Sequence, residues 1–380
     1  MIVRPEGSSL AATVARWMAA LALPSGWRLA SQEVEQGVAL GFRGPRGRLV
    51  VELDVLDPTR GCYARTRRLN VYYSSVDRLR RDLDADERAV VDQVVAAVRA
   101  HEHELPDPGP PDPTIDPARV RVRELRADHA LVPEGDGVYY LNPYVGCLLA
   151  CPYCYAMHRA DGSRALEGEP ILPWGRWVDV KTDLAAVLAR ELPSCAPGVV
   201  RMSPIVTDPY QPIERRYRVT RGCLEALGGT DFVPMILTRS SLVLDDLDRL
   251  RSFPRALVGM SVPTDDDAVR AVFEPRTEAI EARDEALRAL HGAGLRTFAV
   301  IQPMLPMDPA ALVERLAPWV LAVRVAPMYE KPRAAALYRA LGREDAATEA
   351  WERSTFEALR RGFAARGVPV TTREDLHTLL

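Results

Sequence analysis

The sequence lacks long apolar runs and carries no strong excess of either charge. None of its apolar runs approaches the ~20 residues that a membrane-spanning helix needs, so no membrane span is expected. The net charge of −3 over 380 residues provides no overall attraction for nucleic acid, which only a local basic groove could supply. The apolar segment near the start is interrupted by Arg16 and ended by Pro24. This favours an amphipathic first helix over a signal peptide, and a cytoplasmic protein.

Cysteines are also few, and their distribution argues against a disulfide framework. Such frameworks are typical of short secreted chains with evenly spread cysteines. This chain has six cysteines, three of which lie within eight residues. We expect the three clustered thiols to bind metal and the isolated ones to be buried or incidental. The clustered cysteines are Cys147, Cys151 and Cys154, and the isolated ones are Cys62, Cys195 and Cys223.

Proline is concentrated in one segment, which predicts a domain boundary. The stretch LPDPGPPDPTIDP has six prolines in thirteen residues and can form neither a central strand nor a helix interior. We therefore expect a Pro-rich linker over residues 105–118. It would join a small α+β domain over residues 1–104, with a hairpin turn at residues 43–48, to a larger domain over residues 119–380. The last helix of the small domain is expected to bury Val90, Val91, Val94, Val95 and Val98.

The larger domain alternates short apolar runs with helical segments. This alternation predicts an α/β fold with a parallel sheet and crossover helices, either open or closed into a barrel. Chemistry in such sheets gathers at the carboxyl ends of the strands, and Gly146–Cys154 follows the first of them. The expected strands are GVYYLN, GVVRMSPI, FVPMILTR, ALVGMSV, RTFAVIQPM and VLAVRVAPM, and the expected helices cover residues 181–192, 214–227, 243–251, 277–292 and 309–317.

The clustered cysteines have the spacing C-x3-C-x2-C, within GCLLACPYCY. Structural zinc almost always takes four ligands, and the chain offers no fourth cysteine nearby. His158 could complete a zinc site. Three thiolates can instead hold an iron–sulfur cluster of four irons and leave one iron open for a substrate or cofactor. The spacing alone therefore keeps a zinc-binding protein as an alternative to an iron–sulfur enzyme.

This motif resembles the signature of the radical S-adenosylmethionine enzymes, with Tyr153 as the aromatic residue before the last cysteine. The resemblance continues over residues 138–306 and points to the branch that includes spore photoproduct lyase; residues 1–110 have no counterpart in it. It implies a partial (β/α)6 TIM-type barrel, a [4Fe-4S] cluster on the three cysteines, and S-adenosyl-L-methionine chelated by the open iron. Reductive cleavage of that cofactor would release a 5′-deoxyadenosyl radical, which abstracts a substrate hydrogen. The matching stretches are MSPIVTDPYQPIE, ILTRSSLVLDDLDRL, GMSVPTDDDAVRAVFEPRTEAIEARDEALRALHGAGL and VIQPMLP.

The resemblance also implies which residues hold S-adenosylmethionine. Ser203 and Ser261 match serines that contact the cofactor in the lyase, and Arg239 stands where the lyase has a lysine that meets its carboxylate. Tyr155 is expected to pack near the adenine. Gln302, in VIQPMLP, is assigned to the same cofactor site. The alternative role of Ser203 is that of a turn hydroxyl, and the alternative for Tyr155 is core packing.

Two further groups of polar residues follow expected core strands. Asp208 and Tyr210, in TDPYQPIE, should lie over the pocket, where they could orient a substrate or move a proton. The alternative is a proline-bounded turn in which Asp208 acts as a cap. Glu274 and Arg276, in FEPR, are expected to form an ion pair, either in the pocket or on the surface.

One departure from the lyase concerns the substrate. The lyase has a hydrogen-donating cysteine where this chain has Arg201, which does not easily donate a hydrogen atom to a carbon radical. Tyr153 and Tyr155 do match tyrosines implicated in radical relay. Arg201 is a ready anchor for a carboxylate or phosphate, and the acidic balance suits duplex DNA poorly. We therefore expect a small anionic metabolite or a peptide as the substrate. The residues expected to take part in catalysis are Tyr153, Asp208, Tyr210 and Arg201.

These features predict a radical S-adenosylmethionine enzyme of metabolite or natural-product biosynthesis that receives electrons from a donor such as flavodoxin or ferredoxin. Three alternatives stay open, and each has its own signature. A lyase-type enzyme of nucleic-acid repair or modification would bind DNA with a steep salt dependence. Transfer of the aminocarboxypropyl group would yield methylthioadenosine. A zinc-binding protein without enzymatic activity would hold one zinc and no iron.

Overall fold

The computed structural model groups the chain into two compact units. The first unit contains Met1–Pro111 and Tyr155–Pro173, and the second contains Asp112–Cys154 and Trp174–Leu380. The chain therefore passes from the first unit into the second, returns, and leaves again. The residues that the structure describes are 14–34, 38–45, 47–53, 60–65, 70–75, 83–101, 120–135, 137–167, 172, 174–329, 331–372 and 376–379.

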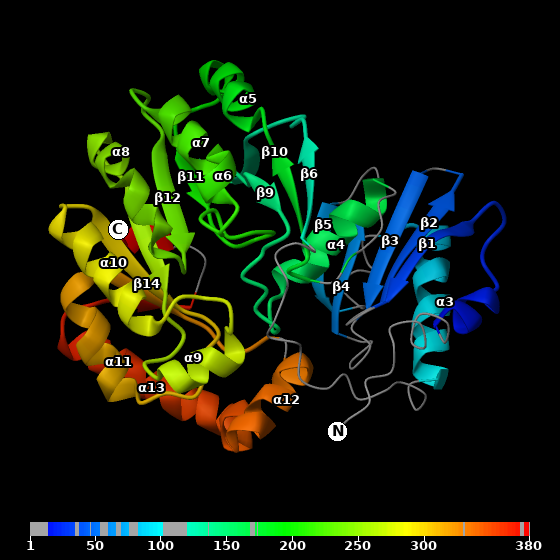
Figure 1. Cartoon of the computed structure of the whole chain (residues 1–380). Coiled ribbons are helices and arrows are strands. Elements are labelled where there is room, and N and C mark those ends of the chain that lie inside the picture. Colours follow the sequence, from blue (N-terminus) through cyan, green and yellow to red (C-terminus); the bar gives the residue numbers. More distant parts are fainter. Residues whose placement is uncertain are drawn as a thin grey trace. The chain divides into compact units, whose positions relative to one another are not determined.

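The first unit is built on a five-stranded antiparallel sheet with the order β1-β2-β3-β4-β5. Strands β2 and β3 stay paired as far as Gly44 and Gly47, which confirms the hairpin turn expected at residues 43–48. The strands, all visible in Figure 1, are β1 (Arg28–Val34), β2 (Val38–Gly44), β3 (Gly47–Leu53), β4 (Arg60–Arg65) and β5 (Asn70–Ser75).

Helix α3 (Ala85–His101) packs one apolar face against this sheet. The five valines expected on that face are all buried and form one cluster with side chains of β2 and β3. Asp84 and Glu87 cap the helix reciprocally. The Glu87 amide donates to Asp84 Oδ1 over 2.9 Å, and the Asp84 amide donates to Glu87 Oε2 over 3.0 Å. This capping box gives two amide groups a partner that the first helical turn cannot supply.

Helix α4 (Ala156–Glu167) also belongs to the first unit, although it closely follows the third clustered cysteine. It packs against β2, β3 and β4. The boundaries expected from the sequence leave this helix in the larger domain, so the first unit takes up more of the chain than residues 1–104. The expected Pro-rich linker, residues 105–118, lies outside the described residues.

The second unit is built on an eight-stranded sheet with the order β16-β15-β14-β13-β12-β11-β8-β7. All neighbours are parallel except β7 and β8. A smaller sheet has the order β6-β10-β9. The strands are β6 (Arg121–Leu125), β7 (Val132–Gly135), β8 (Val138–Tyr140), β9 (Tyr144–Val145), β10 (Trp177–Lys181), β11 (Val199–Met202), β12 (Val233–Thr238), β13 (Leu257–Ser261), β14 (Arg296–Ile301), β15 (Ala322–Val325) and β16 (Val370–Thr371).

Helices connect the parallel strands, as crossovers require, and Figure 1 shows α8, α10, α11 and α13 around the outside of the sheet. No helix in the described ranges has the length and apolar character needed to cross a membrane. The α-helices of this unit are α5 (Leu184–Glu191), α6 (Glu214–Tyr217), α7 (Val219–Leu227), α8 (Leu247–Ser252), α9 (Asp267–Phe273), α10 (Ile280–Gly292), α11 (Pro309–Leu316), α12 (Lys331–Leu341) and α13 (Glu349–Ala365). The 3₁₀ turns are η3 (Leu192–Ser194), η4 (Ser241–Asp246), η5 (Ala317–Trp319), η6 (Glu344–Ala347) and η7 (Leu376–Leu379).

The fold is the predicted mixed α/β fold of a partial barrel preceded by a small sheet domain. The six expected core strands are confirmed as β8, β11, β12, β13, β14 and β15. The single helix expected over residues 214–227 is wrong in one respect. It is two helices, α6 and α7, because Arg218 between them takes a left-handed φ of +52°. The sequence pattern also misses the smaller sheet, in which β9 has only two residues.

Both faces of the eight-stranded sheet are buried, which explains why its strands are continuous apolar runs. One face, with Ile236 of β12, packs in a large cluster with the surrounding helices. The other face, with Phe298 of β14, packs with Leu376 of η7. Gly259 of β13 lies beside Phe298 of β14, and a Cβ at position 259 would lie 2.2 Å from the phenyl ring. A glycine is therefore needed to seat that ring.

Candidate active site

The three clustered cysteines lie in one tight loop, the cysteine loop (Gly146–Cys154). Gly146 and Ala150 take left-handed φ values of +87° and +48°, which turn the chain sharply. A Cβ at position 146 would lie 2.8 Å from the carbonyl oxygen of Trp177, so glycine fits there and larger residues do not. The sequence suggested that this loop directly follows the first core strand, β8; in the structure β9 stands between them.

Two of the three thiols are buried, and Cys154 is partly exposed. Burial raises the pKa of the Cys147 thiol to about 12. It raises the pKa of Cys151 too, although the nearby charge of Arg239 lowers it in part. Such thiols stay protonated at neutral pH unless a metal or cation stabilises the thiolate. Three thiols from one loop are a ligand set for an iron–sulfur cluster, so the residues present fit that cofactor.

A single metal ion is a separate question from a cluster. Within the ranges that the structure describes, no three His, Cys, Asp or Glu side chains are grouped to hold a metal ion. The backbone of His158 lies in α4, in the first unit, and its side chain lies outside the described residues. The alternative in which His158 completes a zinc site therefore stays untested.

The segment after β11 braces the start of the cysteine loop. Thr207 Oγ1 and Gln211 Nε2 both donate to the carbonyl oxygen of Gly146, over 2.8 Å and 2.9 Å. The Leu148 amide donates to Gln211 Oε1 over 2.8 Å. Sequence reasoning singled out this segment, TDPYQPIE, but not these two residues. A buried glutamine between two prolines is a signal that could have drawn attention to it, because a buried amide needs partners on both its ends.

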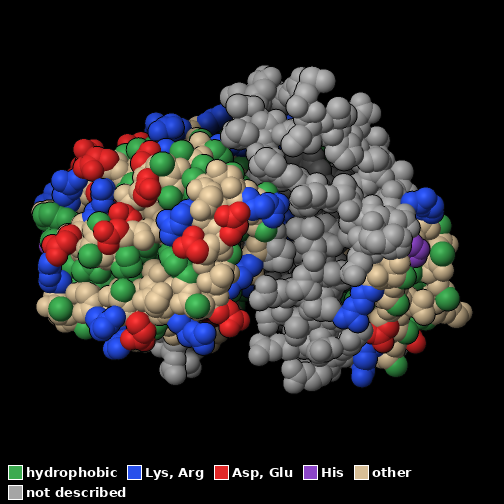
Figure 2. Space-filling view, turned by 90° about the horizontal axis from the view of Figure 1, so that it is seen from below, with side chains coloured by type: hydrophobic (Ala, Val, Ile, Leu, Met, Phe, Trp, Pro, Cys, Tyr) green, Lys and Arg blue, Asp and Glu red, His purple; other side chains and the backbone are tan. Residues whose placement is uncertain are grey.

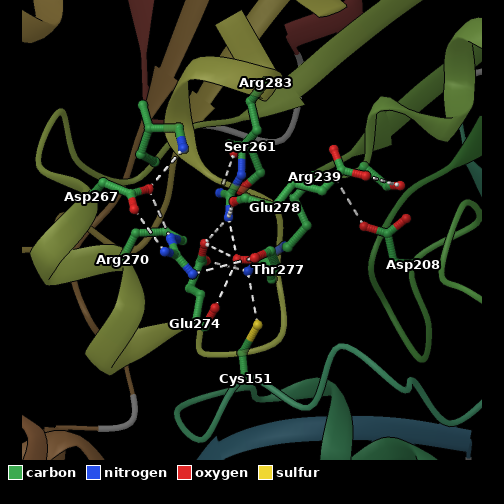
Figure 3. A network of polar contacts seen from close by, with 12 residues as sticks. Cys151, Asp208, Arg239, Ser261, Asp267, Arg270, Glu274, Thr277, Glu278 and Arg283 are labelled. Atoms are coloured by element: carbon green, nitrogen blue, oxygen red, sulfur yellow. Dashed lines mark hydrogen bonds and ion pairs between the residues drawn. The ribbon is translucent and has the colours of Figure 1, made fainter.

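Arg239 follows the carboxyl end of β12, and its side chain contacts the cysteine loop. Its Nη1 lies 3.0 Å from Cys151 Sγ and 3.2 Å from the Tyr153 hydroxyl, and it forms an ion pair with Glu274. The Tyr153 hydroxyl also donates to Glu274. Figure 3 shows the Cys151 side chain directed from its loop toward these residues. The structure therefore unites four residues singled out by the sequence, Cys151, Tyr153, Arg239 and Glu274.

Glu274 is fully buried between two arginines. Its second oxygen pairs with Arg283 of α10 over 2.6 Å. Burial alone raises the pKa of the Glu274 carboxyl, but the charges of Arg239 and Arg283 outweigh it and lower that pKa to about 2. The expected pair of Glu274 with Arg276 is wrong. Arg276 Nη1 instead donates to the carbonyl oxygen of Leu148 in the cysteine loop and to that of Gly175, over 3.4 Å and 3.2 Å.

Asp208 joins the loop after β11 to the end of β12. It accepts hydrogen bonds from the Thr238 hydroxyl over 2.5 Å, from the Arg239 amide over 3.1 Å and from the Tyr210 amide over 2.9 Å. Burial raises its pKa, and these hydrogen bonds with the charge of Arg239 lower it in part. The bond to the amide two residues onward is the turn cap given as the alternative, and the same carboxylate also fixes the backbone of Arg239.

The Tyr210 hydroxyl lies in a different group of residues. It donates to Asp246 Oδ2 over 3.0 Å, and Asp246 pairs with Arg221 over 2.7 Å. These residues line a pocket of about 220 Å³ formed by α6, α7 and η4. The structure therefore brings Asp208 to Arg239 but holds the Tyr210 hydroxyl at this separate pocket.

Arg201 lies on β11 and pairs with Glu134 of β7 over 2.8 Å. Its guanidinium carbon is 5.0 Å from the centre of the Tyr140 ring, a cation–π arrangement. The Tyr140 hydroxyl donates to the same Glu134. Arg201 is therefore engaged with one carboxylate and one aromatic ring, and Glu134 is an acidic partner that the sequence did not suggest.

Ser203, Ser261 and Gln302 stand at or next to the carboxyl ends of β11, β13 and β14. The carboxyl ends of neighbouring parallel strands share one edge of a sheet, so these residues lie along the same edge as Arg239. Ser261 is buried, whereas Ser203 and Gln302 are partly exposed. Ser261 is held through its carbonyl oxygen, which accepts from Arg283 over 3.0 Å.

Tyr155 is partly buried and lies in the first unit, next to the start of α4. The Arg159 guanidinium carbon is 5.8 Å from the centre of its ring. The expected place of Tyr155 beside the adenine of a cofactor therefore stays a prediction.

Known proteins with similar sequences identify the family. The profile of the Radical SAM superfamily matches residues 141–316. An uncharacterized protein of Methanocaldococcus jannaschii is 32% identical over 191 residues, which span 50% of this chain and 70% of that protein. An uncharacterized protein of Mycobacterium tuberculosis is 32% identical over 173 residues, which span 44% of this chain and 50% of that protein. These matches carry sequence similarity without a known substrate.

Solved structures with a similar arrangement include those of spore photoproduct lyase. A mutant with bound AdoMet and dinucleoside spore photoproduct is 17% identical, with a TM-score of 0.46 over 66% of this chain and 80% of that chain. The lyase complexed with dinucleoside spore photoproduct is 16% identical, with a TM-score of 0.48 over 66% of this chain and 81% of that chain. From the superfamily profile and the sequence relatives, the chain belongs to the radical SAM superfamily of enzymes, which work with a [4Fe-4S] cluster and S-adenosylmethionine.

Proposed function

We propose that Cys147, Cys151 and Cys154 ligate the [4Fe-4S] cluster of this radical SAM enzyme, which starts radical chemistry on a small metabolite or a peptide. The observation that carries the ligand assignment is the cysteine loop itself. Its three thiols lie within one sharply turned loop, which can present them to the same cluster. When bound, the cluster supplies the electron for reductive cleavage of S-adenosylmethionine, and the resulting radical abstracts a hydrogen atom from the substrate.

The residues that would hold S-adenosylmethionine are those at the carboxyl edge of the sheet. Arg239 has a cationic side chain beside the cysteine loop, which suits the carboxylate of the cofactor. Ser203, Ser261 and Gln302 lie along the same edge, where hydroxyl and amide groups can donate or accept. Tyr155 would contribute an aromatic surface for the adenine.

Tyr153 and Asp208 take different roles in this proposal. The Tyr153 hydroxyl, within hydrogen-bond distance of Arg239, can hold or pass a hydrogen atom within the cysteine loop. Asp208 orients the backbone of Arg239 through its carboxylate, which makes it a positioning residue. Because the Tyr210 hydroxyl is held by Asp246 at the separate pocket, we leave Tyr210 out of the chemistry.

The substrate side is proposed to lie at Arg201. Glu134 is one of its partners, and that carboxylate is partly exposed. An anionic group of a metabolite or peptide can replace an exposed partner at small cost in free energy. On the one face that Figure 2 shows, acidic and basic side chains are interspersed over the described residues. This pattern, together with the net charge of −3, suits a small ligand better than the phosphate backbone of duplex DNA, which calls for a continuous basic surface.

Radical SAM enzymes require a reductant and a substrate. We propose a one-electron carrier such as flavodoxin or ferredoxin as the reductant, in the cytoplasm, where thiols stay reduced. Biosynthesis of a metabolite or natural product is the process that fits best. A lyase-type nucleic-acid enzyme is the second candidate, because the sequence motifs over residues 138–306 resemble that branch of the superfamily.

The test is anaerobic reconstitution of the full chain with iron and sulfide, followed by reduction in the presence of S-adenosylmethionine. We expect about four irons and about four sulfides per chain, and 5′-deoxyadenosine as the product. Cys147→Ala should lose the cluster, and Cys195→Ala, outside the loop, should keep it. One zinc without sulfide would contradict the ligand assignment. Methylthioadenosine would instead indicate aminocarboxypropyl transfer.

A further inference from the structure

Cys151 has a cationic neighbour that can act on the cluster directly. Arg239 Nη1 lies 3.0 Å from Cys151 Sγ, within hydrogen-bond distance for a sulfur acceptor. The reduction potential of an iron–sulfur cluster depends on net charge and on hydrogen bonds to its sulfurs. A cationic donor on a ligand thiolate stabilises the more negative, reduced cluster. This contact therefore bears on how easily the cluster accepts its electron.

A chain of alternating charges holds Arg239 in that place. Glu274 pairs with Arg239 through one oxygen and with Arg283 through the other. Arg283 in turn donates to the carbonyl oxygen of Ser261, the last residue of β13. Figure 3 shows these side chains converging between the cysteine loop and the sheet. The guanidinium of Arg239 is thus fixed by the fold and does not depend on a bound ligand.

The contacts of Arg239 are all made on one side of its guanidinium. Nη1 carries the bonds to Cys151, Tyr153 and Glu274. Among the described residues, none accepts a hydrogen bond from Nε or Nη2 of this side chain. Arginine offers five N–H donors in a fixed plane. The side chain can therefore keep Nη1 on the thiolate while its other donors meet an anionic group of the cofactor.

We propose that Arg239 tunes the cluster by donating from Nη1 to the Cys151 thiolate, and that Glu274 is the positioning residue that holds it there. The inference rests on the proposed ligation by Cys151. In the step concerned, one electron passes from the one-electron carrier to the cluster, and no covalent bond forms or breaks. The hydrogen bond raises the reduction potential, whereas the negative charge of Glu274 moderates that effect.

The test is a redox titration of the full chain with its reconstituted cluster, followed by electron paramagnetic resonance without S-adenosylmethionine. Arg239→Met removes the cation and should lower the potential. Glu274→Gln removes the anion, keeps the side-chain shape and should raise it. We expect each change to shift the ratio of reduced to oxidised cluster about tenfold at the wild-type midpoint, as for one charge-assisted hydrogen bond. Arg239→Lys should stay close to the wild type.

Opposite signs separate tuning from a merely structural role, because loss of packing would shift both variants in the same direction. Arg249→Met, which breaks a pair with Glu225 outside this chain of charges, is the matched control and should leave the potential unchanged. Shifts of the same sign, or wild-type potentials in both variants, would overturn the proposal. If one of these two variants fails to bind iron, the other still decides. Arg239→Met should lie below the wild-type potential and Glu274→Gln above it, and a wild-type value in the surviving variant would overturn the proposal.

A wild-type chain that takes up no iron and sulfide would refute the proposed ligation, not the tuning. The two failures are therefore distinguishable in one preparation.

Discussion

Two arginine–glutamate pairs of the second unit differ in their access to water. The side chains of Arg239 and Glu274 are 10% and 0% exposed, whereas those of Arg201 and Glu134 are 9% and 29% exposed. A buried charge that loses its partner stays unpaired in a low-dielectric interior. A partner that reaches water can be replaced by water or by another anion. We therefore propose that the Arg239 pair is a fixed part of the cofactor side, whereas the Arg201 pair can exchange its anion on the substrate side.

The largest effect on stability is expected from removing the Glu274 carboxylate. Glu274→Ala leaves Arg239 and Arg283 buried without their shared anion, and we expect a loss of about 3–5 kcal/mol in the free energy of unfolding. Urea unfolding followed by circular dichroism measures it. Glu274→Gln, which keeps the shape and one acceptor, should lose less. A loss below about 1 kcal/mol for the alanine variant would show that the pair is not obligatory.

The next largest effect is expected at the brace of the cysteine loop. Gln211→Ala leaves the Leu148 amide without its acceptor and removes one donor from the Gly146 carbonyl. Unsatisfied buried groups of this kind cost about 1–3 kcal/mol each. The reconstituted variant should lose iron to a chelator faster than the wild type. Thr230→Ala, which removes a turn hydroxyl elsewhere, serves as the control, and equal rates in both variants would refute the bracing role.

A smaller effect is expected at the exchangeable pair. Glu134→Gln should lower the free energy of unfolding by no more than about 1 kcal/mol, because the carboxylate is partly exposed. Reductive cleavage of S-adenosylmethionine should continue at the wild-type rate, since Glu134 lies on the substrate side in this account. Urea unfolding and chromatography of the nucleoside product check the two statements. A collapse of cofactor cleavage would move Arg201 and Glu134 to the cofactor side.

The smallest effect concerns a partly exposed pair in helix α9, Asp267 and Arg270. The hydrogen bond from Arg270 lowers the pKa of Asp267 to about 2, below the unfolded value of about 3.9. The pair therefore stabilises the fold above the unfolded pKa, and this contribution disappears as the pH falls through the folded pKa. Asp267→Asn should cost at most about 0.5 kcal/mol at neutral pH, because the carboxylate is half exposed. The difference in urea midpoint from the wild type should vanish near pH 2, and a constant difference would contradict the assignment.

The sequence predicted the parts of the fold that depend on local pattern. The core strands are apolar on both faces, so each appears as a continuous run such as FVPMILTR. The cysteine loop could be recognised from the spacing of its three cysteines. The helix break at Arg218 was not predicted, because nothing in the helical periodicity of residues 214–227 reveals a residue with a left-handed φ. The sequence also did not predict that α4 belongs to the first unit, because this depends on packing against strands far away in the sequence.

The candidate site, too, could be predicted only in part from the sequence. Motif spacing pointed to Cys151, and the resemblance pointed to Arg239, but their contact spans two elements and needs the fold to be seen. Gln211 and Arg283 were missed because each acts through partners that are distant in sequence. Tyr210 shows the reverse case. Its position two residues from Asp208 suggested a shared role, yet side-chain direction in a turn is set by backbone torsions that the sequence does not display.

The most direct measurement of the central claim is the nucleoside product formed by the reconstituted wild-type chain and by Cys154→Ala under the same reducing conditions. The account predicts 5′-deoxyadenosine that increases with time in the wild type and none in the variant. A wild-type protein with a full complement of iron and sulfide that yields no 5′-deoxyadenosine would contradict it.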